Sequence, residues 1–237
     1  MNPAPFANPS PATNPAPVWL FDLDNTLHDA SHAIFPQINR AMTEYIERHL
    51  AVDRAAAHAL RERYWRHYGA TMTGLVKHHG ITARHFLHET HRLADLHRLL
   101  AYDRRIGRLL RCLPGRRVVF SNGPRDYAIQ VLAAMRLLDV FERVFAIEDM
   151  GYQPKPGTAA FRRLLGQLRL APRQCILVED SEANLRPAKR LGMRTVWISR
   201  ALRKPPHVDL RLASVSELAR HARTALGPLA NRARYRP

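Results

Sequence analysis

Paired cysteines, membrane-length apolar runs and a targeting leader are all missing from this sequence. Its two cysteines, Cys112 and Cys175, form no CxxC pair, and no histidine stands at metal-ligand spacing from either. No apolar run approaches the roughly 18 residues of a membrane-spanning helix. The first residues contain neither a basic leader nor an apolar signal core. These absences argue against a membrane partner and predict a reduced, cytoplasmic setting.

Acidic residues are scarce as well, with 20 Asp and Glu against 37 Lys and Arg and a formal net charge of +17. Such a charge favours association with anions such as phosphates, nucleic acid or acidic lipid. The basic residues are scattered, however, and no long block of them alternates with aromatics as in a groove for single-stranded nucleic acid. We interpret the charge as a solvated surface, and a nucleic-acid partner is not favoured.

Near-continuous apolar runs alternate with helical patterns through most of the chain. The predicted strands cover residues 18–21, 117–120, 144–147, 175–178 and 195–198, with a weaker strand at 208–212. Predicted helices cover 126–138, 158–168 and 215–225. Apolar strands that alternate with helices are typical of a parallel sheet covered on both faces. The pattern predicts an α/β fold, a doubly wound parallel sheet.

The segment between the first two predicted strands is long and helical. It has roughly 95 residues, far more than a crossover connection needs. Its apolar residues recur at helical spacing: Ile34, Ile38, Met42, Tyr45 and Ile46, then Leu60, Tyr64, Trp65 and Tyr68. We predict a helical cap subdomain at 29–111, acting as a lid over a core made of 17–28 and 112–225.

Both ends of the chain lack the composition of a packed core. Residues 1–16 are rich in Pro, Ala and Asn and offer almost no apolar bulk to offset the entropy of ordering. The last residues carry Arg232, Arg234 and Arg236. We predict a disordered tail at 1–16 and a flexible basic tail at 226–237.

Reactive side chains follow the ends of the predicted strands. Asp22 and Asp24 follow the first strand, Ser121 the second and Glu179–Asp180 the fourth, and Lys155 lies between the third and fourth. The carboxyl ends of parallel strands meet at one edge of the sheet, where ligands collect. One carboxylate can attack phosphorus, another can transfer a proton, and a hydroxyl and an ammonium can hold phosphoryl oxygens. Further carboxylates can bind Mg²⁺. The set predicts phosphoryl transfer.

The runs FDLDNTL, SNG, QPKPG and VEDSEANLRPAKRLGM stand in this order within about residues 17–200. They resemble the four motifs of the haloacid dehalogenase superfamily of phosphatases. The resemblance implies a Rossmann-like core with a helical cap inserted after the first strand. It implies that Asp22 is the nucleophile and a Mg²⁺ ligand. It implies that Asp24 is the general acid and base and that its backbone carbonyl also contacts the metal.

The same resemblance assigns roles to the other motifs. Ser121 and Asn122 would bind the phosphoryl group, Lys155 would neutralise it and orient the nucleophile, and Asp180 would bind the metal. Many relatives carry a second acid four residues after this aspartate, where this chain has Asn184. Glu179 would act either on the metal or next to its ligands. Asn184 would orient a water or make a hydrogen bond at the start of a helix.

The cap segment YWRHYGATMTGL, residues 64–75, is similar to that of pyrimidine 5′-nucleotidases of the yeast suppressor-of-thiouracil type. The leading hypothesis is therefore a Mg²⁺-dependent phosphomonoesterase acting on a small phosphorylated substrate, a pyrimidine nucleoside monophosphate. Tyr64 and Tyr68 are candidates for contact with the base, and the alternative is that they pack within the cap.

Other functions stay open at this point. One is a broad phosphatase for sugar phosphates or flavin mononucleotide, which would share every catalytic residue. Another is an inactive scaffold that binds RNA through its positive charge. The sequence does not exclude a phosphomutase. Dehalogenation is disfavoured because Asp24 supplies a proton-transfer group that this chemistry does not need.

Overall fold

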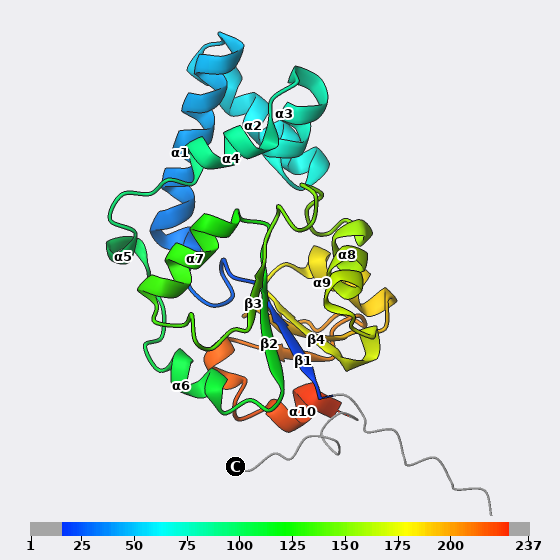
Figure 1. Cartoon of the computed structure of the whole chain (residues 1–237). Helices are drawn as coiled ribbons and strands as arrows, with labels where there is room; N and C mark the ends of the chain where they lie inside the picture. Colours follow the sequence, from blue (N-terminus) through cyan, green and yellow to red (C-terminus); the bar gives the residue numbers. More distant parts are fainter. Residues whose placement is uncertain (1–15, 228–237) are drawn as a thin grey trace, which may run out of the picture.

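The computed structural model describes residues 16–227 (Figure 1). Six strands form one sheet in the order β3-β2-β1-β4-β5-β6, and every neighbouring pair is parallel. The strands are β1 (Val18–Phe21), β2 (Arg116–Phe120), β3 (Arg143–Phe145), β4 (Cys175–Glu179), β5 (Arg194–Ile198) and β6 (Leu210–Leu212). The predicted doubly wound parallel α/β fold is confirmed.

Helices cover both faces of this sheet. One face carries α6 (Ile106–Arg111), α7 (Arg125–Ala134) and α10 (Ala222–Leu226), and the other carries α8 (Thr158–Leu168) and α9 (Glu182–Arg190). The side chains of β1 alternate between the two cores, with Trp19 and Phe21 on the first face and Val18 and Leu20 on the second. Burial on both faces explains the uninterrupted apolar run of this central strand.

The cap is formed by four helices between β1 and β2 and stands above the carboxyl ends of the strands (Figure 1). They are α1 (Ala30–Leu50), α2 (Arg54–Tyr68), α3 (Thr71–His79) and α4 (Ala83–Thr90), and the short α5 (Leu96–Leu99) follows them. Asp29 and Asp53 cap α1 and α2, because their side chains accept hydrogen bonds from the backbone N–H of His32 and Ala56.

Both chain connections between the cap and the core meet at one point. The backbone N–H of Asp29, where the chain enters the cap, donates to the carbonyl of Ala101, where it has left the cap again, at 2.8 Å. The residues that leave the core and those that return to it are therefore tied side by side.

Several element boundaries differ from the sequence prediction. The helix predicted at 126–138 ends at Ala134, and Arg136 then takes a left-handed φ of 57° that turns the chain. The strand predicted at 144–147 ends at Phe145, because the N–H of Ile147 bonds instead to the carbonyl of Gly123.

The prediction of a helix at 215–225 was wrong for the first half of this segment. The chain forms the 3₁₀ turn η2 (Val215–Glu217) and only then α10, and the N–H of Leu218 bonds to the carbonyl of Val215, three residues back. A second such turn, η1 (Pro172–Gln174), precedes β4.

The two predicted tails lie mostly outside the described residues. The exceptions are residue 16 and the first two residues of the segment 226–237. Leu226 is fully buried at the end of α10, so the predicted basic tail began too early. None of the helices within residues 16–227 combines the length and the apolar character needed to cross a bilayer.

Candidate active site

The site is built on the loop that follows β1. The N–H of Asp22 donates to the carbonyl of Val178 in β4 at 2.9 Å, so the loop starts in register with the sheet. Asn25 then takes a left-handed φ of 60°, and the N–H of Leu27 bonds back to the carbonyl of Leu23. This tight turn places the Asp24 carboxyl over the same end of the sheet as Asp22.

Lys155 is the centre of the buried charges. Its Nζ lies 2.7 Å from Asp22 Oδ1, 2.8 Å from Glu179 Oε2 and 2.7 Å from the carbonyl oxygen of Phe120. All three ammonium protons therefore have an acceptor. Asn122 fixes the lysine backbone, since its Oδ1 accepts from the N–H of Lys155 at 2.9 Å and its Nδ2 donates to the carbonyl at 3.0 Å.

The carboxylates around this lysine outnumber it. Burial, with the charge of Glu179 next, raises the pKa of Asp22 to about 7. Burial and the charge of Asp22 raise the pKa of Asp180 to about 6. Burial also raises the pKa of Glu179. Burial lowers the pKa of Lys155, but the carboxylates of Asp22 and Glu179 outweigh it and the net shift is upward.

This excess of negative charge fits a divalent cation. Asp22, Glu179 and Asp180 each offer an oxygen, and these oxygens all lie within 4.8 Å of one another. Oxygen is the donor that Mg²⁺ prefers, and a bound cation would offset charges that one ammonium leaves uncompensated. These three residues would hold the ion. The direct contact predicted for the backbone carbonyl of Asp24 stays a prediction.

Removal of the cation is expected to make the stability of the protein fall as pH rises. The folded-state pKa values of Asp22 and Asp180 lie above the value of about 4 that these carboxyl groups have in the unfolded chain. The folded protein therefore binds protons at these two groups more tightly than the unfolded chain does. Their contribution to the free energy of unfolding is complete below about pH 4 and is lost as pH rises through about 7. Melting in EDTA should show this loss between pH 5 and pH 8.

Added Mg²⁺ should reverse the loss at pH 8. Saturation at 100 times Kd contributes about 2.7 kcal/mol, and protons compete with the ion less at pH 8 than at pH 5. The rise in Tm should therefore be larger at the higher pH, and Asp180→Asn should reduce it. An equal rise at both pH values would contradict the assignment of these carboxylates to the metal.

Two hydrogen bonds orient the Asp24 carboxyl. Tyr127 Oη donates to Oδ1 at 2.5 Å, and His28 Nε2 lies 3.1 Å from the same oxygen. Burial, with the Asp24 charge next, raises the pKa of Tyr127, so this phenol stays protonated and acts as a donor. His91 packs edge-on against the tyrosine ring, and burial lowers the pKa of this histidine to about 4. Oδ2 has no hydrogen bond from the described residues.

The sequence prediction missed both residues that orient Asp24. His28 ends the run FDLDNTLH, four residues after Asp24, and this spacing is a signal that could have revealed it. Tyr127 lies 103 residues away on α7, and no local pattern indicates such a contact.

Ser121 and Asn184 lie near the carboxylates in different settings. Ser121 is 1% exposed directly after β2, and its Oγ accepts from the N–H of Gly123 at 3.0 Å, which leaves the hydroxyl proton free to donate. Asn184 is buried in the first turn of α9, and its N–H bonds to the carbonyl of Ser181. Its predicted role toward a water stays a prediction.

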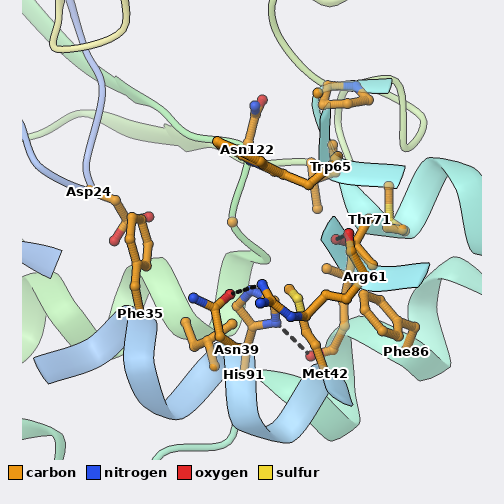
Figure 2. A pocket seen from close by; sticks show the side chains of 18 of the residues that line it. Asp24, Phe35, Asn39, Met42, Arg61, Trp65, Thr71, Phe86, His91 and Asn122 are labelled. Carbon is orange, nitrogen blue, oxygen red and sulfur yellow. Dashed lines mark hydrogen bonds between the residues drawn. The ribbon is translucent and has the colours of Figure 1, made fainter. Parts of the chain in front are cut away.

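A cavity of about 660 Å³ lies between the cap and these strand ends (Figure 2). The core contributes Asp24, Asn122 and Tyr127, and the cap contributes apolar, aromatic and charged side chains. The principal cap residues are Phe35, Asn39, Met42, Arg61, Trp65 and Phe86. The position of the cap over Asp24 agrees with the predicted lid, whose motion stays a prediction.

The structure does not bring Tyr64 and Tyr68 to this cavity. They line a separate hollow of about 360 Å³ on the cap, and their hydroxyls bond to His79 and His78 at 2.7 and 2.6 Å. Tyr64 packs so closely on α3 that a Cβ at Gly74 would lie 2.1 Å from its ring. The two tyrosines therefore pack the cap, and Trp65 is the aromatic residue of α2 that faces the cavity.

Two known proteins show the extent of the sequence similarity. The chain is 24% identical over 194 residues to phosphate metabolism protein 8 of Saccharomyces cerevisiae, covering 74% of this chain and 59% of that protein. It is 30% identical over 81 residues to validoxylamine A 7′-phosphate phosphatase of Streptomyces hygroscopicus subsp. limoneus, covering 34% and 38%. It thus spans less than two thirds of either relative.

A solved structure gives the same fold. A HAD phosphatase from Thermococcus onnurineus superposes with a TM-score of 0.61 at 21% identity, over 89% of this chain and 98% of that one. The family model for haloacid dehalogenase-like hydrolases matches residues 18–192, a span that starts at β1 and includes the first three motifs and all but the last residue of the fourth. The resemblance seen in the sequence is confirmed, and the chain belongs to the haloacid dehalogenase-like hydrolase family.

Proposed function

We propose that the protein hydrolyses phosphomonoesters through an aspartyl-phosphate formed on Asp22. The observation that carries this proposal is the buried contact of Lys155 Nζ with Asp22 Oδ1 at 2.7 Å, at strand ends shared with Ser121 and Asp24. The lysine holds one carboxylate oxygen and leaves the other to attack. This arrangement provides a positioned nucleophile, a proton donor and donors for phosphoryl oxygens in one place.

The reaction has two steps. In the first, the free oxygen of Asp22 forms a bond to phosphorus, the ester P–O bond breaks, and Asp24 gives a proton to the leaving oxygen. In the second, water attacks the same phosphorus, Asp24 takes the proton from that water, and inorganic phosphate leaves. Asp22 returns as the free carboxylate, so the atoms and protons balance.

The remaining residues stabilise charge. The Ser121 hydroxyl proton is free to donate to a phosphoryl oxygen as negative charge shifts from the ester toward the leaving group. The three protons of the Lys155 ammonium already have acceptors, so this group would act by its positive charge and by holding Asp22. Bound Mg²⁺ would supply further positive charge for these oxygens. Asp22, Asp180 and Glu179 would hold the ion.

The bonds to Asp24 favour phosphatase chemistry over dehalogenation. A halide leaves without a proton, so a dehalogenase needs no acid at this position. In this chain Tyr127 and His28 hold that carboxyl by one oxygen and leave the other free. Such orientation supports a proton-transfer role.

The cap cavity supports a nucleoside monophosphate as substrate. Its volume lies within the range usual for small-molecule sites, and Trp65 and Phe35 offer flat aromatic surfaces to a base. The similarity of residues 64–75 to pyrimidine 5′-nucleotidases supports UMP and CMP as the substrates. A second candidate is a sugar-like phosphate, favoured by the similarity to validoxylamine A 7′-phosphate phosphatase.

Phosphate release by the purified protein with Mg²⁺ tests the proposal. We expect turnover of UMP, CMP and p-nitrophenyl phosphate, with kcat/KM for UMP about tenfold or more above ribose 5-phosphate, since a single good contact to the base gives about 1.4 kcal/mol. No release from any substrate, while a control phosphatase works, would contradict the function. Preference for ribose 5-phosphate would support the second candidate.

A further inference from the structure

Arg61 is a largely buried charge in the cavity that leads to Asp24. It lies on α2, its side chain is 13% exposed, and it lines the cavity together with Asp24 and Asn122 (Figure 2). Nothing in the reaction steps uses it. A buried guanidinium is costly unless an anion or several acceptors surround it.

The protein supplies few acceptors to this guanidinium. Nη1 donates to Asn39 Oδ1 at 3.0 Å, and Nη2 lies 3.3 Å from His58 Nε2 (Figure 2 shows the first bond). Nε is buried and has no partner among the described residues. Neither of the two bonded partners is a carboxylate.

The nearby carboxylate is engaged elsewhere. Glu62 Oε1 lies 3.8 Å from Arg61 Nη2, beyond hydrogen-bond distance, while Oε2 of the same residue accepts from Arg66 at 2.5 Å. The Arg66 bond is also the largest cause of the lowered pKa of Glu62. Arg61 therefore forms a long ion pair with Glu62 but donates no hydrogen bond to it, and a ligand with an acceptor atom would complete the hydrogen bonds of the guanidinium.

The surroundings limit what that ligand can be. Apolar and aromatic side chains make up most of the cap side of the cavity, including Phe35, Met42 and Phe86. Trp65 stays 62% exposed at the same cavity, although a tryptophan ring gains from being covered. A flat ring with a hydrogen-bond acceptor on its edge would cover the indole face of Trp65 and give the Arg61 guanidinium an acceptor with one and the same group.

We propose that Arg61 is the specificity residue of this site and donates to a carbonyl oxygen on the ring of the leaving group. The proposal deepens the proposed function and rests on it. It states that the site selects phosphomonoesters whose leaving group carries a carbonyl-bearing planar ring. Asn39 orients the guanidinium, because its Oδ1 accepts a hydrogen bond from Arg61 Nη1 at 3.0 Å.

The test compares Arg61→Gln with the wild type on UMP, phenyl phosphate and ribose 5-phosphate, with Mg²⁺ present. UMP has a planar ring with carbonyls, phenyl phosphate has a planar ring without them, and ribose 5-phosphate has no planar ring. We expect KM for UMP to rise about 10- to 100-fold with kcat changed less than about threefold, the effect of losing a charged hydrogen bond made in the ground state and the transition state alike. The other two substrates should change less than about twofold.

Arg63→Gln is the matched control. It removes the same charge from the same helix, but Arg63 is exposed and lines the separate hollow beside Tyr64. We expect it to change no substrate by more than about twofold.

Each outcome separates the two proposals. Phenyl phosphate turnover by wild type without preference for UMP would overturn the role of Arg61 and leave the phosphatase intact. Equal losses of Arg61→Gln on all three substrates would also overturn it, because the arginine would then act on the phosphate or the fold. No turnover of any substrate by wild type would instead overturn the phosphatase itself.

Discussion

Asp22→Asn is expected to lower kcat for phosphate release by about 10⁴- to 10⁶-fold, the loss seen when a nucleophile is removed from a group of residues that act together. An amide oxygen is a poor nucleophile and does not form the aspartyl-phosphate. It can still accept the bond from Lys155 Nζ that now goes to Oδ1, so the site keeps its shape. Steady-state phosphate release from UMP or p-nitrophenyl phosphate measures the effect.

A stability measurement shows whether the loss of activity in Asp22→Asn comes from the missing nucleophile or from unfolding. Burial raises the pKa of Asp22, which means that its charged form is unfavourable in the folded protein without a cation. A neutral asparagine should therefore leave Tm in EDTA at pH 8 unchanged or higher. Asp126→Asn, an exposed neighbour on α7, is the charge-matched control and should retain activity within about twofold. Near-normal turnover by Asp22→Asn would refute the assigned nucleophile.

Asp24→Asn is expected to reduce kcat/KM by about 10²- to 10⁴-fold, the usual contribution of a positioned general acid. The asparagine oxygen still accepts from Tyr127 and His28, but the amide nitrogen in place of Oδ2 gives no proton to the leaving group. kcat/KM reports the step in which the ester bond breaks, so it isolates the acid role from the later attack of water.

The leaving group supplies an internal control for this second substitution. p-Nitrophenolate leaves readily without a proton, whereas an alkoxide such as the nucleoside 5′-oxygen does not. The loss should therefore be larger for UMP than for p-nitrophenyl phosphate. Tyr127→Phe keeps the carboxylate and removes one of its two hydrogen bonds, so it should fall between wild type and Asp24→Asn. Equal losses on both substrates would show that Asp24 acts through structure and not as an acid.

The local sequence pattern was sufficient for β1 and α8, which have the bounds predicted for them. β1 is a continuous apolar run buried on both faces, and α8 is an amphipathic helix whose buried residues recur at helical spacing. The parallel order of the strands then brought Asp22, Lys155 and Glu179 together, although up to 133 residues separate the bonded pairs. The rule that ligands bind at the carboxyl ends of parallel strands was enough to predict this cluster without knowledge of the individual side-chain contacts.

Contacts made by helix residues with distant segments could not be predicted from local sequence patterns. The bond of Tyr127 to Asp24 joins α7 to the loop after β1, and nothing within a few residues of either indicates it. The same holds for α2, where periodicity marks Tyr64 as one of the apolar residues but does not say which helix covers it. α3 covers it through Gly74, and this leaves the cavity to Arg61 and Trp65. The 3₁₀ turn η2 likewise depends on tertiary packing.

The bond between Asp29 and Ala101 gives the cap a single pivot. Because entry and exit of the chain are joined there, a rigid rotation of the four cap helices would turn about this point and would leave β1, β4 and Lys155 in place. Substitutions near the bond between Asp29 and Ala101 would then change how fast substrate enters and product leaves, without moving Asp22.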